Sequence, residues 1–514
     1  MPTYLSPGVY VEEVPAGSRP IEGVGTAVAA FVGLTSQGEF NQPTLVTSWT
    51  QFSQKFGDFV PDTYVAHAVY GYFLNGGGAA YIVRVGNDGN GAGRGSKALP
   101  TGPQAMLGGL RVAALESSGQ GSTITVEVAD PVGDPPPEDA FKLVVKRGNK
   151  IEETYDAVTT RRGKDNVVSQ VKEKSKLIKI EEVATGAALA KPDNQTVALA
   201  VPAPAPPPSI EHLEADDYVG DAADRTGFSG LEAVDEVTMI CIPDLMSAYE
   251  RGALDLEAVQ AVQLAMIAHC ELMGDRVAIL DPPPALAPQQ VKEWRVDKAG
   301  YDSKFATLYY PWIKVFDPPS GTNRMVPPSG HMAGIWARTD DTRGVHKAPA
   351  NEVVRGAVAL DVQLTKPEQD MLNPIGINCL RAFPGRGIRV WGARTLSGEA
   401  EWRYLNVRRL FNYLEESILN GTQWVVFEPN DDALWARIRR TISAFLVNEW
   451  RKGALFGLTP DEAFYVKCDR DTNPPEAIDA GQVTCEIGVA PVKPAEFVVF
   501  RLAQFSAGAS LVSE

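Results

Sequence analysis

The chain has 514 residues, of which 44% are hydrophobic and 22% are charged, as expected for a globular protein of about two to four domains. Its 48 Lys and Arg residues against 64 Asp and Glu residues give a formal net charge of −16. This acidity argues against a protein that follows the phosphate backbone of a nucleic acid. Because no apolar run reaches about 18 residues, we expect no transmembrane helix and no direct membrane insertion.

The cysteines and the N-terminus point to synthesis in a reducing compartment. The five cysteines form no CxxC pair and no short-spaced cluster with histidine, so we expect buried thiols and no zinc site. The opening MPTYLSPGVYVEEV has neither the basic nor the apolar segment of a signal peptide. We therefore expect synthesis and first assembly in the cytoplasm.

Residues 1–20 are predicted to form an extended N-terminal arm. Pro7 and Pro15 flank a segment whose β-branched and aromatic residues favour a strand, and the prolines restrict that strand to an edge. The alternatives are a frayed terminus and a strand lent to a neighbouring subunit. The residues expected in the strand are Val9, Tyr10, Val11, Glu12 and Val14.

Residues 21–86 are predicted to form the N-terminal part of the core. The apolar run 26–34 predicts a buried strand, and residues 45–56 predict a strand followed by a short helix. A helix is expected at 64–74, ending at three glycines that suit a helix C-terminus, and a further strand at 80–85.

Residues 87–230 are predicted to be a mostly-β insert between a glycine-rich and a proline-rich joint. The glycine-rich joint lacks the Gly-Lys-Ser/Thr of a phosphate loop. Strands are expected at 110–114 and 122–129, and residues 141–147 and 151–155 flank a Gly-Asn hairpin signal. The mixed charges of 142–182 indicate a solvated face rather than a ligand surface.

Residues 231–369 show the alternation of an α/β domain. Strands at 237–242 and 276–280 flank a helix at 256–273, which predicts a right-handed parallel crossover. A helix is expected at 287–297, followed by a strand at 305–315 that bends near Pro311.

Residues 370–494 are predicted to form a C-terminal α+β domain, and residues 495–514 a second arm. Strands are expected at 378–383, 388–394 and 481–490, and helices at 404–420 and 432–452. The arm is expected to contain a strand at 495–503, including Phe497, Val498, Val499, Phe500 and Arg501.

The segment 326–351, VPPSGHMAGIWARTDDTRGVHKAPAN, carries residue types typical of an active site: Ser329, His331, Asp340, Asp341, Arg343 and His346. It lacks the G-x-S-x-G turn of a nucleophile, and adjacent carboxylates such as Asp340 and Asp341 point in different directions. His269 and Asp244 would complete a set of triad residue types without a motif that brings them together. We therefore predict no catalytic residue, no metal site and no cofactor.

Several motifs resemble those of contractile tail sheath proteins, in the same order. They are SPGVYVEEV at 6–14, GVGTAVAAFVG at 23–33, FLNGGGAAYIVRV at 73–85, the segment 326–351, INCLRAFPGRGIRVWGARTL at 377–396, RYLNVRRLFNYLEESI at 403–418 and APVKPAEFVVFRL at 490–502. The motifs are spread over about three quarters of the chain, and the resemblance leaves out residues 87–230.

The resemblance implies a tail-sheath fold of mixed α/β class. Its parts would be a subtilisin-like α/β central domain without protease activity, a C-terminal α+β domain, the inserted mostly-β domain and two strand arms. The family builds the sheaths of phage tails, R-type bacteriocins and extracellular injection systems. The expected partners are further copies of the chain in stacked hexameric rings, an inner tube, and baseplate and tail-terminator or cap proteins.

The same resemblance also implies which residues contact neighbouring subunits and the inner tube. The arms would complete β-sheets in neighbouring subunits, and the basic residues Arg437, Arg440, Arg451 and Lys452 would face an acidic inner tube. A basic solvated helix face is the alternative for these four. Within 326–351, Ser329 is expected to cap a helix beginning at Met332, and Asp340, Asp341 and Arg343 to fix its end or contact a neighbour. A hydrolase and a secreted adhesion module are the competing hypotheses.

Overall fold

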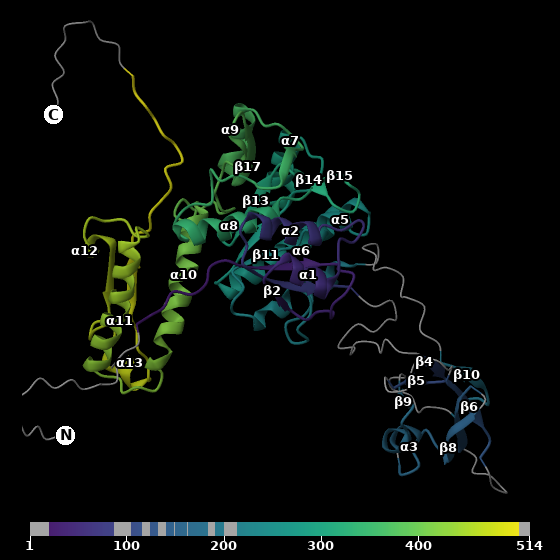
Figure 1. The fold of residues 1–514 in the computed structure, drawn as a ribbon. Coiled ribbons are helices and arrows are strands. Elements are labelled where there is room, and N and C mark those ends of the chain that lie inside the picture. The colour runs from purple at the N-terminus through teal and green to yellow at the C-terminus, as the bar shows by residue number, and fades with distance from the viewer. Residues whose placement is uncertain are drawn as a thin grey trace, which may run out of the picture. The chain divides into compact units, whose positions relative to one another are not determined.

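The computed structural model describes residues 20–86, 104–115, 124–131, 140–148, 150–161, 163–182, 191–199 and 213–502. These residues belong to two compact units (Figure 1). One unit combines Met1–Gly86 with Pro208–Glu514, and the other is Asn87–Pro207. An inserted unit is therefore present, but it ends at Pro207 rather than at the expected residue 230.

The first unit is built on an eight-stranded sheet. Its strand order is β18-β17-β13-β12-β11-β1-β3-β2. The neighbouring strands from β17 to β3 pair in parallel, and the two outer strands pair antiparallel. The strands, in that order, are Gly387–Val390, Ile377–Phe383, Ala306–Tyr310, Val277–Leu280, Met239–Cys241, Val28–Gly33, Ala79–Arg84 and Thr44–Val46. A parallel sheet with fully buried central strands confirms the α/β prediction.

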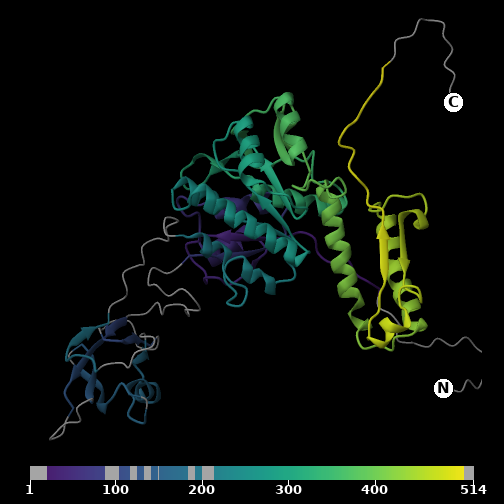
Figure 2. The same ribbon diagram turned by 180° about the vertical axis from the view of Figure 1, so that it is seen from behind.

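Helices cover this sheet (Figures 1 and 2). The helix predicted at 256–273 is α6, Leu256–Met273; it begins where the Asp255 side chain accepts from Ala258 N and ends at left-handed Gly274. The others are α1 (Trp49–Phe56), α2 (Val65–Asn75), α4 (Ala215–Val219), η2 (Ser229–Ala233), α5 (Asp244–Glu250), α7 (Pro288–Glu293), η3 (Trp294–Ala299), α8 (Ser329–Arg343), α9 (Lys366–Leu372) and η4 (Asn373–Ile375). Tyr218 of α4 is buried in the core of this unit, so the residues just before 230 belong here and not to the insert.

A three-stranded sheet, ordered β15-β14-β16, lies beside the main one. Its strands are β14 (Ile313–Asp317), β15 (Thr322–Val326) and β16 (Ala357–Leu360). The strand predicted at 305–315 is in fact two strands in different sheets, because the chain leaves the main sheet after β13 and enters this one at β14. The predicted bend at Pro311 is therefore the crossing point between sheets.

The C-terminal part of this unit has its own apolar core. Two long helices, α10 (Leu405–Thr422) and α11 (Asp432–Arg451), lie side by side, connected through η5 (Gln423–Val425) (Figures 1 and 2). Their predicted bounds were within about two residues of these. After α11 come α12 (Pro460–Ala463), β19 (Phe464–Lys467), α13 (Pro475–Asp479) and β20 (Glu486–Val489). The sequence predicted β20 but not β19, to which it pairs antiparallel.

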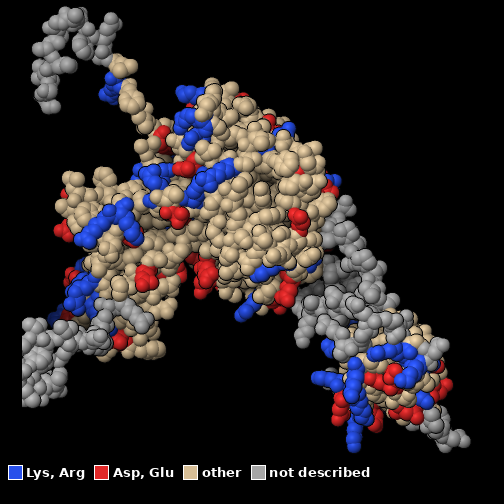
Figure 3. Space-filling view, in the orientation of Figure 1, with Lys and Arg blue, Asp and Glu red and all other residues tan. Residues whose placement is uncertain are grey.

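The inserted unit consists of two antiparallel sheets around one core, as predicted for a mostly-β insert. Their orders are β10-β6-β7-β8 and β4-β5-β9. The elements are β4 (Gln104–Leu107), β5 (Leu110–Ala114), β6 (Ile124–Ala129), β7 (Phe141–Arg147), β8 (Lys150–Val158), α3 (Val167–Lys174), β9 (Ile178–Glu182) and β10 (Thr196–Ala198). The predicted hairpin is the β7–β8 pair. Basic and acidic side chains lie intermixed on its surface (Figure 3).

Candidate assembly interface

The segment 326–351 forms a buried helix rather than a catalytic site. Ser329 is buried, and its backbone N–H and hydroxyl donate to the two carboxylate oxygens of Asp281 at 3.0 and 2.5 Å. The predicted cap at Ser329 is wrong: α8 begins at Ser329 with Pro328 before it, and Asp281 supplies the acceptor from the end of β12. Burial raises the pKa of Asp281 to about 7, although the two hydrogen bonds from Ser329 oppose the rise.

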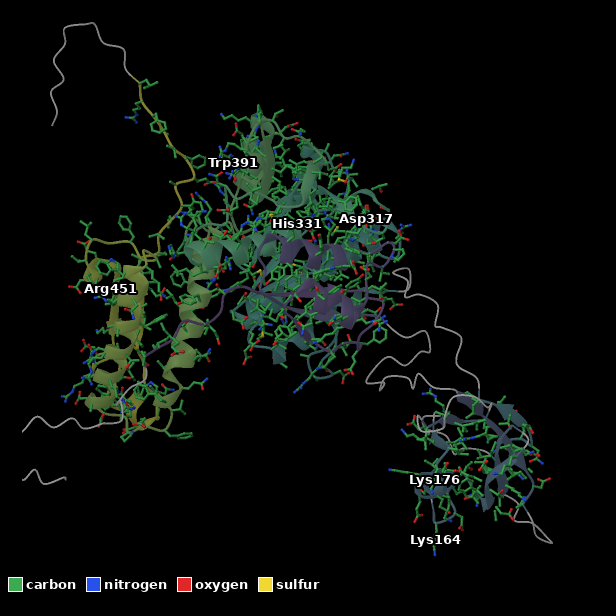
Figure 4. The ribbon with its side chains drawn as sticks, viewed as in Figure 1. Lys164, Lys176, Asp317, His331, Trp391 and Arg451 are labelled. Carbon is green, nitrogen blue, oxygen red and sulfur yellow. The ribbon has the colours of Figure 1, made fainter. Side chains whose placement is uncertain are left out.

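His331 lies inside this unit, against helix α2 (Figure 4). A carbon added at Gly71 of α2 would lie 2.3 Å from the imidazole Cε1, so the ring packs directly on the α2 backbone. Burial lowers the pKa of His331 to about 4. Gly330 and Gly334 allow the same approach on either side, because a side chain there would collide with Ala68 and Tyr72. The glycines and histidine of the segment therefore serve helix packing.

The other candidates for a triad are engaged separately. Asp244 accepts backbone N–H groups of Leu34, Tyr64 and Val65 at 2.7, 2.5 and 2.8 Å. His269 lies 3.5 Å from a guanidinium nitrogen of Arg276. Neither residue hydrogen-bonds to Ser329, whose hydroxyl is directed to Asp281. The described residues thus contain no serine–histidine–carboxylate relay of these groups.

Asp340 joins the end of α8 to the C-terminal helices. It accepts two hydrogen bonds from Arg409 of α10 at 2.9 and 2.5 Å, and one from the Thr26 hydroxyl at 2.7 Å. The two charged side chains are 5% and 4% exposed. Asp341 and Arg343, by contrast, are exposed. Of the three residues expected to fix the helix end, Asp340 does so by binding another part of its own chain.

The C-terminal part presents a small sheet with two open edges. Within the described residues β19 and β20 pair only with each other, although an isolated bridge joins Leu455 to Pro491 just beyond β20, so each strand has one unpaired edge. Nearby apolar side chains are exposed, among them Phe456, Leu458 and Tyr465. An open strand edge beside apolar side chains is the usual acceptor for an added strand.

The C-terminal arm leaves the domain from a fixed point, Glu496. Its carboxylate accepts from Arg394 at 2.9 and 2.7 Å, from the Asn373 amide at 2.8 Å and from the Tyr404 hydroxyl at 3.0 Å. Burial alone would raise the pKa of Glu496, but these hydrogen bonds and the Arg394 charge lower it. The sequence analysis missed this residue; its signal was a single acidic group at the start of an apolar run.

Beyond Glu496 the arm is apolar and exposed. Phe500 is 85% and Leu502 98% exposed, and Phe497, Val498 and Val499 are also largely exposed. Residues 497–502 form no strand in the isolated chain, and the predicted strand at 495–503 has no partner there among the described residues. The predicted N-terminal strand residues Val9, Tyr10, Val11, Glu12 and Val14 lie outside the described residues.

The four basic residues expected to face an inner tube are not equivalent. Arg437 pairs with Glu428 at 3.1 Å and lies over the Trp424 ring, and Lys452 pairs with Glu449 at 2.7 Å. Arg440 and Arg451 (Figure 4) are exposed and make no ion pair or hydrogen bond with the residues that the structure describes. They lie eleven positions apart on α11, on the face opposite its buried side.

The described residues form neither a metal site nor a membrane-spanning helix. No three His, Cys, Asp or Glu side chains among them are grouped in a way that would hold a metal ion. No helix in the described ranges is sufficiently long and apolar to cross a membrane.

Two family models match the chain. Residues 215–396 match the phage tail sheath protein central domain, and residues 398–505 match the phage tail sheath C-terminal domain. Together the matches cover more than half of the 514 residues.

Tail sheath proteins of phages are among the similar sequences. The chain is 24% identical to the tail sheath protein of Burkholderia phage BcepMu over 96% of this chain and 95% of that protein. It is 28% identical to the tail sheath protein of Vibrio phage KVP40 over 46% of this chain, and this match spans only 38% of the longer phage protein.

Solved structures share the fold. The anti-feeding prophage helical sheath in its contracted state matches with a TM-score of 0.59 and 24% identity, over 98% of this chain and all of that chain. The sheath complex of an extracellular contractile injection system, PVC, in the contracted state, gives a TM-score of 0.58 at 23% identity over 98% of this chain and 99% of that one. The chain therefore belongs to the contractile tail sheath family, as a structural, non-enzymatic component of a phage tail or tail-like particle.

Proposed function

We propose that the chain polymerises into a helical sheath of stacked hexameric rings around an inner tube, and that contraction of the sheath drives the tube through a target envelope. The observation that carries this proposal is the exposed apolar segment 497–502, which is anchored at Glu496 and has no strand partner among the described residues of its own chain. The hydrolase and adhesion alternatives have no comparable support.

In the proposed lattice, residues 497–502 add a strand to the β19–β20 sheet of a neighbouring subunit. An added strand gains main-chain hydrogen bonds that the segment lacks in the isolated chain. Its apolar side chains would also leave water against the exposed Phe456, Leu458 and Tyr465 of that neighbour. The N-terminal strand residues 9–14 are proposed to join a neighbouring sheet in the same way.

Contraction requires two arrangements of the same subunits, with the extended one metastable. Main-chain pairing in the arms would hold neighbouring rings together while their bodies rotate and slide. The ion pair between Asp340 and Arg409, by contrast, holds α8 and α10 of one subunit together. The proposal is that each subunit moves largely as a body and that its arms act as the hinges between bodies.

The inner tube is proposed to be held through exposed arginines. Arg440 and Arg451 offer charges that no neighbouring carboxylate in the described chain neutralises. Attraction between exposed charges is weak and screened by salt, which suits a tube that must be released during contraction. Arg437 and Lys452 are the weaker candidates because each already pairs with a glutamate.

The remaining partners follow from the same proposal. A sheath of finite length would start on a baseplate protein and end at a tail-terminator or cap protein, and assembly would take place in the bacterial cytoplasm. The particle is either a phage tail or an injection particle such as a bacteriocin. Capsid and terminase genes beside the sheath gene would identify a phage, and their absence an injection particle.

The test exchanges Val499 in the arm. Val499→Pro removes a backbone N–H that an added strand needs, whereas Val499→Ala keeps it and only shortens the side chain. We expect the proline variant to remain folded and to form no tubes in negative-stain micrographs, and the alanine variant to form them. Ile151→Ser, which alters an exposed apolar residue of β8 outside the arm, is a further control and should leave tube formation unchanged. Tubes of normal yield from Val499→Pro would overturn strand addition.

A further inference from the structure

Two of the five cysteines flank the β19–β20 hairpin: Cys468 directly follows β19, and Cys485 directly precedes β20. The antiparallel register pairs Phe464 with Val489 and Lys467 with Glu486. If the same register is extended by one residue beyond the strand ends, Cys468 lies opposite Cys485. Both are free thiols.

The local geometry suits a bond between them. Directly opposed residues of antiparallel strands have Cβ atoms about 4.5–5.5 Å apart, close to the 3.5–4.5 Å of a disulfide. Each thiol also lies close enough to the other to affect its pKa. The loop between them is already closed by Asn473, whose amide donates to Asp469 O and Thr484 O at 3.0 Å each and whose carbonyl oxygen accepts from Thr484 N at 2.6 Å. A disulfide would therefore connect backbone that is held in place without it.

The two cysteines differ in access. Cys468 is fully buried, whereas Cys485 is partly exposed. The other three, Cys241, Cys270 and Cys379, are buried in the core of the main sheet. A small reagent in solution therefore reaches Cys485 first, and Cys468 is the thiol placed to react next.

We propose that Cys468 and Cys485 are a redox-sensitive pair that a low-molecular-weight disulfide converts into an intramolecular disulfide. The Cys485 thiolate attacks one sulfur of the reagent, giving a mixed disulfide at Cys485 and releasing one thiol. The Cys468 thiolate then attacks the Cys485 sulfur and releases the second thiol. In total the protein loses two hydrogens, and one reagent disulfide becomes two thiols.

The surroundings set the conditions for this reaction. Burial, reinforced by Cys468, raises the pKa of Cys485 to about 12, so little thiolate is present at neutral pH. The pair stays reduced in a reducing cytoplasm and oxidises slowly in an oxidising medium, faster as pH rises. The product fastens together the strands proposed above to accept a neighbour's arm, but the inference does not depend on sheath assembly.

The test treats the purified full-length chain with oxidised glutathione under mildly alkaline, non-denaturing conditions. Digestion without reduction, followed by mass spectrometry, should yield a peptide pair that joins Cys468 to Cys485 and is lighter by two hydrogens than its reduced parts. No such pair, or a mixture of links that includes Cys241, Cys270 and Cys379, would overturn the proposal, since the mixture indicates reaction of unfolded chains.

Two variants separate the roles of the thiols. Cys468→Ser should retain one glutathione per chain at Cys485, because no second thiol displaces it. Cys485→Ser should form neither the link nor an adduct at Cys468. An adduct on Cys468 in that variant would contradict the assigned order of attack. The oxidised wild-type chain should also unfold a few degrees higher than its reduced form, a shift absent in both variants.

Discussion

Helix α8 and the arm at 497–502 differ in whether their side chains find partners within the chain. α8 carries residue types common in active sites, yet Ser329 and Asp340 are buried and paired within the chain, with Asp281 and Arg409 respectively. The arm carries phenylalanine, valine and leucine, yet these side chains are largely exposed and no described residue pairs with the arm as a strand. The polar segment therefore serves stability, and the apolar segment is the one that still requires a partner.

The contrast shows that residue type alone misleads about function. A buried polar group is costly unless it is paired, so polar residues inside a core are held by a network that fixes one arrangement. An apolar run in water costs free energy until it is covered, so it marks an interface. Both inferences need the position of the residue and not only its identity.

The largest effect is expected from breaking the Asp340–Arg409 pair. Arg409→Ala and Asp340→Ala each leave a buried charge without its partner, which costs about 3–5 kcal/mol of the free energy of unfolding. The double variant should lose less stability than the sum of the two single variants, because it leaves no buried charge without a partner. Asp341→Ala, one position along and exposed, is the matched control and should change little. Urea unfolding of the wild type and the four variants measures these differences; additive losses would mean that the two side chains do not act as a pair.

A second prediction concerns the pH dependence that Asp281 imposes. Burial raises its pKa from the ordinary 3.8 to about 7 in the folded state, so between these pH values the folded state binds a proton that the unfolded state does not. The stability contributed by this proton is present at low pH and is lost as pH rises through about 7. Asp281→Asn removes the titration while keeping the shape.

The measurement compares the wild type with Asp281→Asn by urea unfolding at about pH 5 and about pH 8. The wild type should lose on the order of 2–3 kcal/mol relative to the variant over that interval. His331, with its pKa lowered to about 4, changes stability with the opposite sign. Because both chains contain His331, its contribution cancels in the difference. A difference independent of pH would show that Asp281 stays ionised in the folded protein.

A smaller effect is expected at the root of the arm. Glu496→Gln removes the charge that Arg394 binds but keeps the side-chain length, so we expect a loss of about 1–2 kcal/mol from charge-assisted hydrogen bonds. Tube yield should fall more than this loss of stability suggests. Without the Arg394 contact, the arm would extend from its domain in a less defined direction and meet a neighbouring subunit less often. Glu476→Gln, an exposed glutamate of α13, is the control. Equal tube yields from the two variants would show that the direction of the arm is unimportant.

Much of the fold could be predicted because the relevant signals are local. The helix at 256–273 had an apolar face, an aspartate at its start and a glycine at its end, and the strands at 110–114 and 141–147 had alternating apolar residues. These patterns depend on neighbours a few residues away. The α/β class and the inserted β unit followed from their order along the chain.

The misses involve partners that are distant in sequence. Ser329 had the residue type of a helix cap, but Asp281, 48 positions earlier, provides the acceptor. β19 is four residues long and is stabilised by its pairing with β20, so its own sequence carries little signal. Of the four basic residues on and after α11, only the structure separates the two that pair with glutamates from the two that do not.

The smallest effect tests that last distinction. Arg440→Ala with Arg451→Ala should weaken binding of the chain to an assembled inner tube several-fold at low salt, since exposed ion pairs are each worth about 0.2–1 kcal/mol. Arg437→Ala is the matched control on the same helix, and its charge is already neutralised by Glu428. Co-sedimentation with tubes at low and high salt measures the difference, which should vanish at high salt. If Arg437→Ala weakens binding as much as the double variant does, pairing within the chain does not decide which charges face the tube. The lack of an ion-pair partner would then not identify the interface residues of α11, whereas in the arm the proposed interface is identified by exposed apolar side chains.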